Sequence, residues 1–259
     1  MSDQIRSFKI LTLNLWHDNL PSANRERAQR HLIEGLSPDV IGFQEVLRDG
    51  NNCQAKDLVS DLGYEVAYGE VVPFWKRSGV LYGNAIASRF PFRNVRNYPL
   101  SSGGSSERRA AIFVEIDCVE GSIFAACTHL HHRSSRVRFI QAKDLISAYD
   151  MFLNDCGGLK SSHHFVLGDL NSSPGKEVTA VLEPTFLDAF ETAGKGLGLT
   201  WSIENPYAKV QNSRGVRIDY IWSSKDSSAI VNSCQVVGDT AIDGVYPSDH
   251  FGVFASFIL

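Results

Sequence analysis

The sequence lacks a strong excess of charge of either sign, and it lacks long hydrophobic runs. Its 25 Lys and Arg residues stand against 29 Asp and Glu residues, which gives a net charge of −4. Proteins that hold duplex nucleic acid mainly through their overall field are usually basic, so any phosphate-binding surface here is expected to be local. The longest apolar runs, such as Ile123–Cys127, fall far short of the roughly 20 residues of a membrane-spanning helix. The first residues also lack the apolar core of a signal peptide.

Paired cysteines and several well-known catalytic loops are also missing. The cysteines are odd in number, and no two have the close spacing of a zinc knuckle or a redox motif. We therefore expect reduced thiols in a cytoplasmic protein, three or four of them buried. The absence of a Gly-rich phosphate loop and of a dinucleotide fingerprint argues against those nucleotide sites. The absence of Gly-x-Ser-x-Gly argues against a serine hydrolase. The cysteines are Cys53, Cys118, Cys127, Cys156 and Cys234.

The composition is that of a folded globular protein, with 43% hydrophobic and 21% charged residues in a chain of 259. The Ser/Gly-rich stretch Ser101–Ser106 is short enough to be a loop, so we expect a single domain over residues 1–259. Helices are predicted over Ser22–Leu36 and Ser135–Leu153, which carry apolar residues on one face. A shorter helix is predicted over Ser173–Leu182, with Pro174 in its first turn.

Short apolar, β-branched runs bounded by Gly, Pro, Asn, Asp or Ser recur along the chain, and each predicts a strand. These runs are Phe8–Leu15, Val40–Phe43, Gly83–Ala87, Ala110–Ile116, Ile123–Cys127, His164–Leu167, Arg217–Trp222 and Phe251–Phe257.

The order of these elements contains a weak internal repeat. A strand that ends in a polar residue, Asn14, precedes a helix and then a buried strand that ends at Glu45. The same order returns between His129 and Asp169. Each helix must cover one face of a sheet, so two such units predict an α/β protein with two packed sheets and helices outside, a four-layer α/β/β/α sandwich. Polar residues at the strand ends of both halves then gather at one rim.

Acids, amides and histidines follow directly after these buried strands. A carboxylate in that position costs free energy unless it is paired, hydrogen-bonded or metal-bound. Taken singly, a strand-end acid is as often a turn residue or a helix cap, and a lone buried histidine is more often structural. Taken together, these hard oxygen ligands, amides and imidazoles suit Mg²⁺ or Mn²⁺ and the activation of water for phosphoryl transfer. The set is Asn14, Glu45, His129, Asp169, Asn171, Asp219, Asp249 and His250.

Seven motifs run nearly from end to end of the chain. They are Leu11–Leu15, Asp39–Val46, Gly83–Pro91, Thr128–Leu130, Gly168–Pro174, Arg217–Ile221 and Ser248–His250. In this order they resemble the endonuclease/exonuclease/phosphatase superfamily, the group of DNase I, exonuclease III, neutral sphingomyelinases and inositol polyphosphate 5-phosphatases. The resemblance implies a DNase I-like sandwich of two packed mixed sheets flanked by helices. It also implies divalent-metal-dependent hydrolysis of phosphoesters, with Mg²⁺ expected and Mn²⁺ as the alternative.

The resemblance implies a role for each matching residue. Glu45 matches the glutamate that binds the catalytic cation, Asn14 the asparagine beside it, and Asp249 a carboxylate close to the metal. Asp169 and Asn171 match the pair that orients the attacking water or the substrate and contacts the phosphate.

A second group of matching residues concerns the phosphate and the substrate. His250 matches the general base, or in the other reading the imidazole that polarises the phosphate, and Asp219 matches its carboxylate partner. His129 matches a histidine that donates to the phosphate or protonates the leaving oxygen. Arg109 lies where relatives often have an arginine before a strand, and Trp201 lies in a loop on the substrate side.

The other histidines near these motifs have no catalytic role implied by the resemblance. Family motifs require only His129, so His131 and His132 are assigned at most to the rim or to a substrate contact. His163 and His164 precede a strand and are expected to be surface and packing residues.

The substrate class stays open at this stage. Glu45 is followed by Val46 and Leu47 rather than by the Thr-Lys of abasic-site endonucleases, and no basic cluster of the inositol 5-phosphatase kind follows Asn171. The segment Val72–Arg77 mixes aromatic rings with cations, so it can stack on a base, lie against lipid headgroups, or be a packed surface turn.

We therefore favour a phosphodiesterase acting on nucleic acid, in particular single strands, or on a nucleotide. The alternatives are a sphingomyelinase-like phospholipid phosphodiesterase with peripheral lipid contact, and a small-molecule phosphatase. A non-catalytic binding module is disfavoured, because Glu45, Asp169 and His250 are all present.

Overall fold

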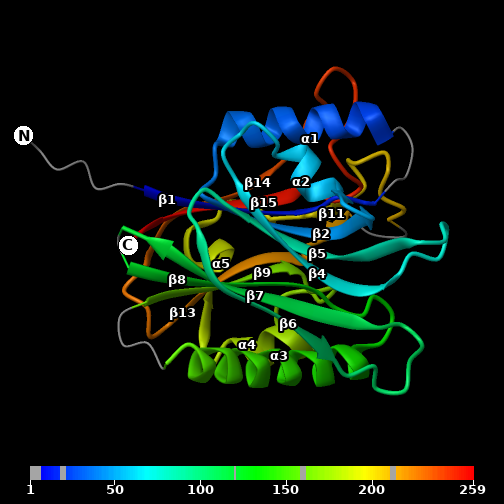
Figure 1. The fold of residues 1–259 in the computed structure, drawn as a ribbon. Coiled ribbons are helices and arrows are strands. Elements are labelled where there is room, and N and C mark those ends of the chain that lie inside the picture. Colours follow the sequence, from blue (N-terminus) through cyan, green and yellow to red (C-terminus); the bar gives the residue numbers. More distant parts are fainter. Residues whose placement is uncertain (1–6, 18–21, 120, 158–161, 211–213) are drawn as a thin grey trace, which may run out of the picture.

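The computed structural model has four layers, with two pairs of helices outside and two sheets between them, and the short helix α5 (Ala189–Ala193) lies between the sheets (Figure 1). Helices α1 (Ser22–Leu36) and α2 (Gln54–Leu58) cover one sheet, and α3 (Ser135–Asp155) and α4 (Glu177–Leu182) cover the other. The four-layer α/β/β/α sandwich is thus confirmed. The described residues are 7–17, 22–119, 121–157, 162–210 and 214–259. The chain start that was considered for a signal peptide, residues 1–6, lies outside them.

Both large sheets of the described residues mix parallel and antiparallel strands. The first has the order β14-β15-β1-β2-β5-β4, with β3 on β2, and the second has the order β10-β13-β9-β8-β7-β6. A small ribbon pairs β11 with β12. The strands of the first sheet are β1 (Ser7–Asn14), β2 (Val40–Asp49), β3 (Asn52–Cys53), β4 (Glu65–Pro73), β5 (Val80–Ser88), β14 (Ile230–Val237) and β15 (Gly252–Ile258). The others are β6 (Phe92–Leu100), β7 (Arg109–Cys118), β8 (Gly121–His129), β9 (Ser162–Asp169), β10 (Phe186–Asp188), β11 (Trp201–Ser202), β12 (Gly215–Val216) and β13 (Asp219–Ser224).

The internal repeat of the sequence corresponds to two parallel crossovers. Strand β1 pairs in parallel with β2 across α1, and β8 pairs in parallel with β9 across α3. Parallel strands end at the same edge of their sheet, so the polar residues at their ends come together. Strand β15 pairs antiparallel with β1, so strands from the two ends of the described chain belong to one sheet.

Three apolar clusters fill the spaces between the layers. The central one joins the two sheets through side chains such as Ile10, Ile112 and Leu167. A second lies between α3 and the sheet that contains β6 to β10 and β13, and it includes Phe152 and Trp222. A third lies between α1 and the other sheet and includes Ile33. Each cluster removes large apolar side chains from water, which stabilises the sandwich.

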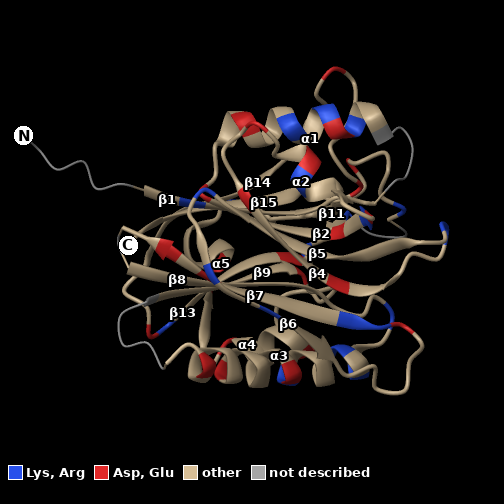
Figure 2. Cartoon of the chain, viewed as in Figure 1, with Lys and Arg blue, Asp and Glu red and all other residues tan. Residues whose placement is uncertain are grey.

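Helix α1 also buries polar groups on the face that packs on its sheet. Arg25 and Gln29 are almost fully buried, whereas the apolar Leu32 and Leu36 are only half-buried. The Arg25 guanidinium donates to the carbonyl of Leu15 at 2.7 Å. These contacts hold the chain just after β1, where candidate site residues follow. Arginines and glutamates both occur along α1 (Figure 2). No helix of the described residues is both long and apolar enough to cross a membrane.

The secondary structure differs from the sequence prediction in several places, of which the start of α4 and three edge strands are the clearest. Helix α4 begins at Glu177, not at Ser173, because the backbone first makes a turn in which Lys176 N donates to Ser173 O and Gly175 has a φ of +71°. Pro174 therefore precedes the helix and is not in its first turn. Strands β4, β6 and β14 were not predicted; all three are edge strands that bury only one face, so their sequences lack apolar runs.

His163 and His164 are both buried within β9, so the expectation of packing residues is confirmed and the expectation that they lie at the surface before the strand is wrong. The His164 ring contacts the Tyr149 hydroxyl and packs edge-on against Phe124. Burial, followed by the charge of His163, lowers the pKa of His164 to about 4. Of the cysteines, Cys53, Cys118, Cys127 and Cys234 are buried, Cys156 is half-buried, and all are free thiols, as expected.

The low pKa of His164 predicts a loss of stability in mild acid. In the unfolded chain this imidazole gains a proton near pH 6.5, but in the folded protein it does so only near pH 4. The free energy of unfolding should therefore fall between pH 6.5 and 4, by up to about 3 kcal/mol from this residue. Urea denaturation of the wild type and of His164→Gln at several pH values measures the effect. The variant should have the flatter profile, and parallel profiles would contradict the prediction.

Candidate active site

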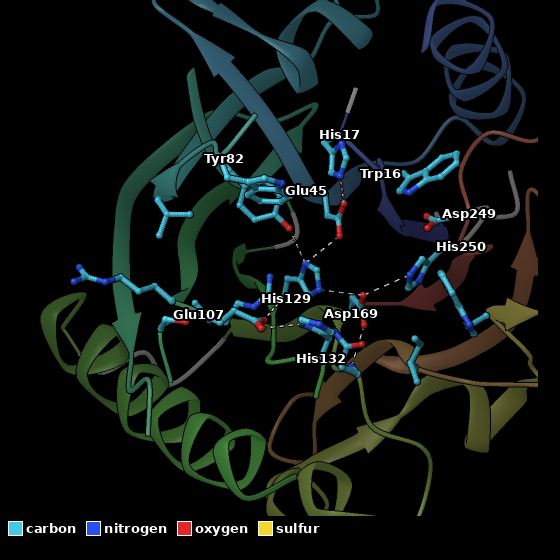
Figure 3. Close-up of a pocket in the computed structure, with 18 of the residues that line it drawn as sticks. Trp16, His17, Glu45, Tyr82, Glu107, His129, His132, Asp169, Asp249 and His250 are labelled. Carbon is cyan, nitrogen blue, oxygen red and sulfur yellow. Dashed lines mark hydrogen bonds and ion pairs between the residues drawn. The ribbon is translucent and has the colours of Figure 1, made fainter. Parts of the chain in front are cut away.

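A cavity of about 870 Å³ opens at the rim of the sandwich where the strand ends meet. Figure 3 shows its side chains pointing toward one another from both sheets. The expected site residues on its lining are Glu45, Arg109, His129, Asp169, Asn171, Trp201, Asp249 and His250. The two remaining ones, Asn14 and Asp219, lie behind this lining and bond to Asp169 and His250.

Strand register places three of these residues side by side. His129 is the partner of Asp169 in the β8–β9 pair, and Asp219 is the partner of Asp169 on the other side, in the β13–β9 pair. His129 Nε2 lies 3.3 Å from Asp169 Oδ2. The next residue but one, Asn171, donates its backbone N–H to Asp169 Oδ1 at 2.9 Å. Asp169 is thus held at the centre of the site.

Asn14 joins the two sheets at this point. It ends β1 in one sheet, and its Nδ2 donates to Asp169 Oδ2 in the other at 3.3 Å. Its Oδ1 accepts the backbone N–H of Trp16 at 2.9 Å. Asn14 therefore fixes the position of Asp169 relative to the chain that follows β1.

A bulge in β2 turns Glu45 toward the cavity. The register of β2 against β5 shifts between Phe43 and Val46, and Glu45 has a φ of +58°, which is unusual for a residue other than glycine. Such strain persists where surrounding structure enforces it, and it is common at functional sites. Glu45 Oε2 lies 3.7 Å from His17 Nε2, and Oε1 lies 3.9 Å from His129 Nδ1. Figure 3 shows the two rings on opposite sides of the carboxylate.

His250 and Asp219 form a close pair. His250 Nδ1 lies 2.9 Å from Asp219 Oδ2, and Trp201 packs edge-on against the imidazole with ring centres 4.7 Å apart. The second ring nitrogen, Nε2, faces Asp169 Oδ2 at 3.8 Å. Burial opposes the charged form of His250, but Asp219 and then Asp169 outweigh it and raise the pKa of His250 well above its usual value. This shift favours the imidazolium form of His250.

The pKa of the other central histidine, His129, is shifted in the opposite direction. Burial, together with the positive charges of Arg109 and His250, lowers the pKa of His129 well below its usual value. Two histidines whose environments separate their pKa values in this way can take different roles in proton transfer. The neutral ring places one N–H toward Asp169, because His129 Nε2 faces that carboxylate and His129 Nδ1 faces the Tyr82 hydroxyl at 3.4 Å.

Comparison of the sequence with models of protein families gives a match that spans these motifs. The sequence model of the endonuclease/exonuclease/phosphatase family matches residues 11–250. The chain belongs to this family. Membership indicates a hydrolytic phosphoesterase. A search of curated proteins returned no match.

Solved structures of endonuclease/exonuclease/phosphatase proteins share the fold. A Bacteroides vulgatus family protein has 19% identity and a TM-score of 0.76, with 98% of this chain and 99% of that one covered. Truncated TDP2 from Caenorhabditis elegans has 20% identity and a TM-score of 0.76, with 98% of each chain covered. D. rerio TDP2, complexed with single-strand DNA product, has 21% identity and a TM-score of 0.75, with 97% and 98% covered. The fold is therefore DNase I-like.

Proteins of the endonuclease/exonuclease/phosphatase family are typically dependent on a divalent cation, and the carboxylates of Glu45 and Asp249 on the cavity lining are oxygen donors that suit one. Asp249 lies close enough to Glu45 for the two charges to interact. Burial raises the pKa of Asp249 to about 7; the charge of His250 opposes this rise, and the negative charge of Glu45 contributes to it. A cation bound by these oxygens would relieve that repulsion. Asn14 fits less directly, because its Oδ1 already accepts the Trp16 N–H.

A second set of possible metal ligands also lies at the family site. Ligand atoms of Asp169, Asp219 and His250 lie within 4.8 Å of one another. We interpret this set as a proton-transfer group and not as a metal centre, because His250 Nδ1 is already hydrogen-bonded to Asp219. Burial and the neighbouring Asp219 raise the pKa of Asp169 to about 7. The Asp169 carboxylate can therefore accept and release a proton near neutral pH.

Arg109 lines the cavity, but its charge is matched within the protein. Its guanidinium forms an ion pair with Glu107, which also receives His132 Nδ1 at 2.8 Å. Although burial opposes it, the His132 hydrogen bond and the charge of Arg109 lower the pKa of Glu107 to about 2. Arg109 Nε is buried and has no hydrogen-bond partner among the described residues. The expected phosphate contact would thus involve a guanidinium that already has a carboxylate partner.

The motifs of the family did not point to every residue of the cavity. Trp16, His17, Tyr82 and Glu107 also line it, and so does His132, which was assigned to the rim, whereas His131 is not on the lining. Trp16 and His17 could have been found, because they follow the strand-end Asn14 directly. Tyr82 lies in the middle of a strand and Glu107 in a loop, so only the packing of the two sheets brings them to the rim.

Proposed function

We propose that the chain hydrolyses phosphodiester bonds at this cavity with the help of a divalent cation, and that its substrate is single-stranded nucleic acid or a nucleotide. One observation carries the proposal. A buried imidazolium, His250, and a neutral imidazole, His129, lie on either side of Asp169, next to the Glu45 carboxylate. This arrangement provides a proton acceptor and a cationic hydrogen-bond donor within one phosphate-sized space.

The protonation states suggest how the residues share the reaction. Asp169 accepts the proton of the attacking water, and its neighbours Asn14, His129 and Asn171 N hold its oxygens in place. The Nε2–H of His250 donates to the phosphate and supplies the proton that the leaving oxygen needs. Of the two roles considered for this histidine, the proposal adopts the polarising imidazolium. The cation, when bound by Glu45 and Asp249, supplies positive charge that stabilises the transition state.

The remaining polar groups of the cavity orient the substrate. Asn171 donates one Nδ2 hydrogen to Leu130 O at 3.0 Å, which leaves its second hydrogen for a phosphate oxygen. The neutral His129 directs its N–H to Asp169, so we assign it to orienting that carboxylate in preference to protonating the leaving group. Trp201 supports the His250 ring from the side.

An aromatic wall supports a substrate with a flat base. Trp75 is 66% exposed at the cavity and packs on Phe74 at 4.7 Å and Tyr82 at 5.5 Å between ring centres. A supported but exposed indole can stack on an unpaired base. The D. rerio TDP2 structure, which has this fold, was solved with a single-strand DNA product. We also propose a cytoplasmic location, because the cysteines are free thiols.

Removal of the Trp75 ring should weaken the binding of an oligonucleotide more than it slows the chemistry. Stacking of one base is worth about 1–3 kcal/mol, so Trp75→Ala should raise KM for single-stranded DNA by about 5- to 150-fold, with kcat within about threefold. Steady-state kinetics with a labelled oligonucleotide measures both constants. Trp75→Phe, which keeps a ring, serves as the matched control and should lie between. An unchanged KM in Trp75→Ala would remove Trp75 from the substrate site.

A parallel assay tests the substrate class. Purified protein is incubated with labelled single-stranded DNA, single-stranded RNA, sphingomyelin and a phosphomonoester, with added Mg²⁺ or with EDTA. We expect cleavage of a nucleic acid that EDTA abolishes. Cleavage of sphingomyelin alone would support the phospholipid alternative, for which the exposed Trp75 and its neighbours Lys76 and Arg77 would be the membrane contact. Turnover of the monoester alone would support a phosphatase.

A further inference from the structure

His17 lies in a strained segment whose backbone is firmly held. It has a φ of +35°, and the preceding Trp16 has a φ of +54°, although neither is glycine. The His17 carbonyl accepts hydrogen bonds from Arg25 at 3.2 Å and from Gln54 at 3.0 Å. Strain that neighbouring groups enforce in this way commonly serves to aim a side chain. Here it directs the imidazole into the cavity (Figure 3).

The imidazole approaches Glu45 with one nitrogen. Its Nε2 lies 3.7 Å from Glu45 Oε2, which is too long for a hydrogen bond. Phe74 and Trp75 pack against the ring, with ring centres 5.4 and 5.8 Å away. Two atoms that each bind one cation at about 2.1 Å are roughly 3 to 4 Å apart, so this separation suits two ligands of a shared ion.

We propose that His17 Nε2 is a nitrogen ligand of the cation that Glu45 binds, so that the site prefers Mn²⁺ to Mg²⁺. The inference rests on the metal dependence of the proposed function. Mg²⁺ takes oxygen ligands almost exclusively, whereas first-row transition metals accept imidazole readily. One nitrogen among carboxylate oxygens therefore shifts the preference toward Mn²⁺. Neither the strand-end motifs nor the family match assigns this residue.

The competing interpretation makes the opposite prediction for metal affinity. If His17 were an imidazolium paired with Glu45, its charge would compete with the metal for the same carboxylate. Removing the imidazole would then tighten the binding of both cations. If His17 is a ligand, the same substitution weakens the binding of Mn²⁺ and leaves that of Mg²⁺ nearly unchanged. The sign of the change in affinity separates the two.

The first measurement is calorimetric titration of the whole metal-free protein with Mn²⁺ and with Mg²⁺. The wild type is compared with His17→Phe, which keeps a ring between Phe74 and Trp75, and with Glu45→Gln. We expect His17→Phe to lose about tenfold or more in Mn²⁺ affinity and less than about threefold in Mg²⁺ affinity. Glu45→Gln should weaken both. Tighter binding of Mn²⁺ by His17→Phe would overturn the proposal.

Pulsed electron paramagnetic resonance of bound Mn²⁺ provides a readout that does not depend on enzymatic activity. The spectrum of the wild-type protein is informative without any variant. Coupling of the electron spin to an imidazole nitrogen is expected, and it should change when histidine is labelled with ¹⁵N. The coupling should disappear in His17→Phe and persist in His132→Phe, which removes another imidazole of the same cavity. Mn²⁺ bound through Glu45 without nitrogen coupling would overturn the ligand role and leave the proposed function intact. If Mn²⁺ does not bind, or if its binding does not depend on Glu45, both the ligand role of His17 and the proposed function would be overturned.

Discussion

Replacement of His250 by alanine is expected to lower kcat by about 1,000-fold or more. The substitution removes the imidazolium that Asp219 and Asp169 maintain, and with it both a hydrogen-bond donor and a positive charge at the phosphate. The loss of charge also leaves Asp219 buried without its partner, so some destabilisation is expected. Turnover is therefore measured well below the thermal transition of the variant, which circular dichroism defines.

A matched histidine substitution controls for nonspecific effects. His31 is exposed on α1, away from the cavity lining, so His31→Ala should keep kcat within about twofold of the wild type. If folded His250→Ala kept more than a tenth of the wild-type kcat, the imidazolium would have no part in the reaction, and the proposed division of roles would be wrong.

Replacement of Asp169 by asparagine is expected to lower kcat by about 100- to 10,000-fold. The amide has nearly the same shape and can still accept the Asn171 N–H through its oxygen, but it cannot accept a proton from water. The negative charge of Asp169 also contributes to the high pKa of His250. The substitution should lower that pKa, so His250 loses its proton at a lower pH and the alkaline limb of the pH–rate profile moves to lower pH.

The pH–rate profile of kcat for the wild type and for Asp169→Asn tests this coupling. Asp239→Asn, an exposed change on the surface, serves as the control for loss of a carboxylate and should leave both the rate and the profile unchanged. An Asp169→Asn enzyme with a much lower kcat but an unmoved alkaline limb would show that His250 and Asp169 titrate independently. A kcat close to that of the wild type would exclude Asp169 as the proton acceptor.

The layers of the fold could be predicted because its central strands are buried on both faces. The two strand–helix–strand units that end at Glu45 and Asp169 appear in the structure as parallel crossovers. Strands β4, β6 and β14 escaped prediction because each lies at a sheet edge and polar residues interrupt its apolar ones. The start of α4 was misplaced because Pro174 fits a first helical turn and also fits the tight turn that the chain actually makes.

The candidate site was predictable where acids and histidines stand at the ends of apolar strands. Asp169 and His129 follow apolar strands, so their sequence positions alone indicated a shared rim, and register pairing confirmed it. The bulge that turns Glu45, the positive φ that directs His17, and the opposite charge states of the two histidines depend on local backbone geometry and on burial. No residue pattern along the chain encodes these three features on its own.

The most direct test of the proposed activity is hydrolysis of a simple phosphodiester, bis-(p-nitrophenyl) phosphate, in ¹⁸O-labelled water. It requires neither base stacking nor a lipid surface, so it isolates the chemistry at Glu45, Asp169 and His250. We predict turnover that needs Mg²⁺ or Mn²⁺, is abolished by EDTA and by His250→Ala, and places one ¹⁸O atom in the product phosphate. Turnover that persists in EDTA and in His250→Ala, or a product without ¹⁸O, would contradict this prediction.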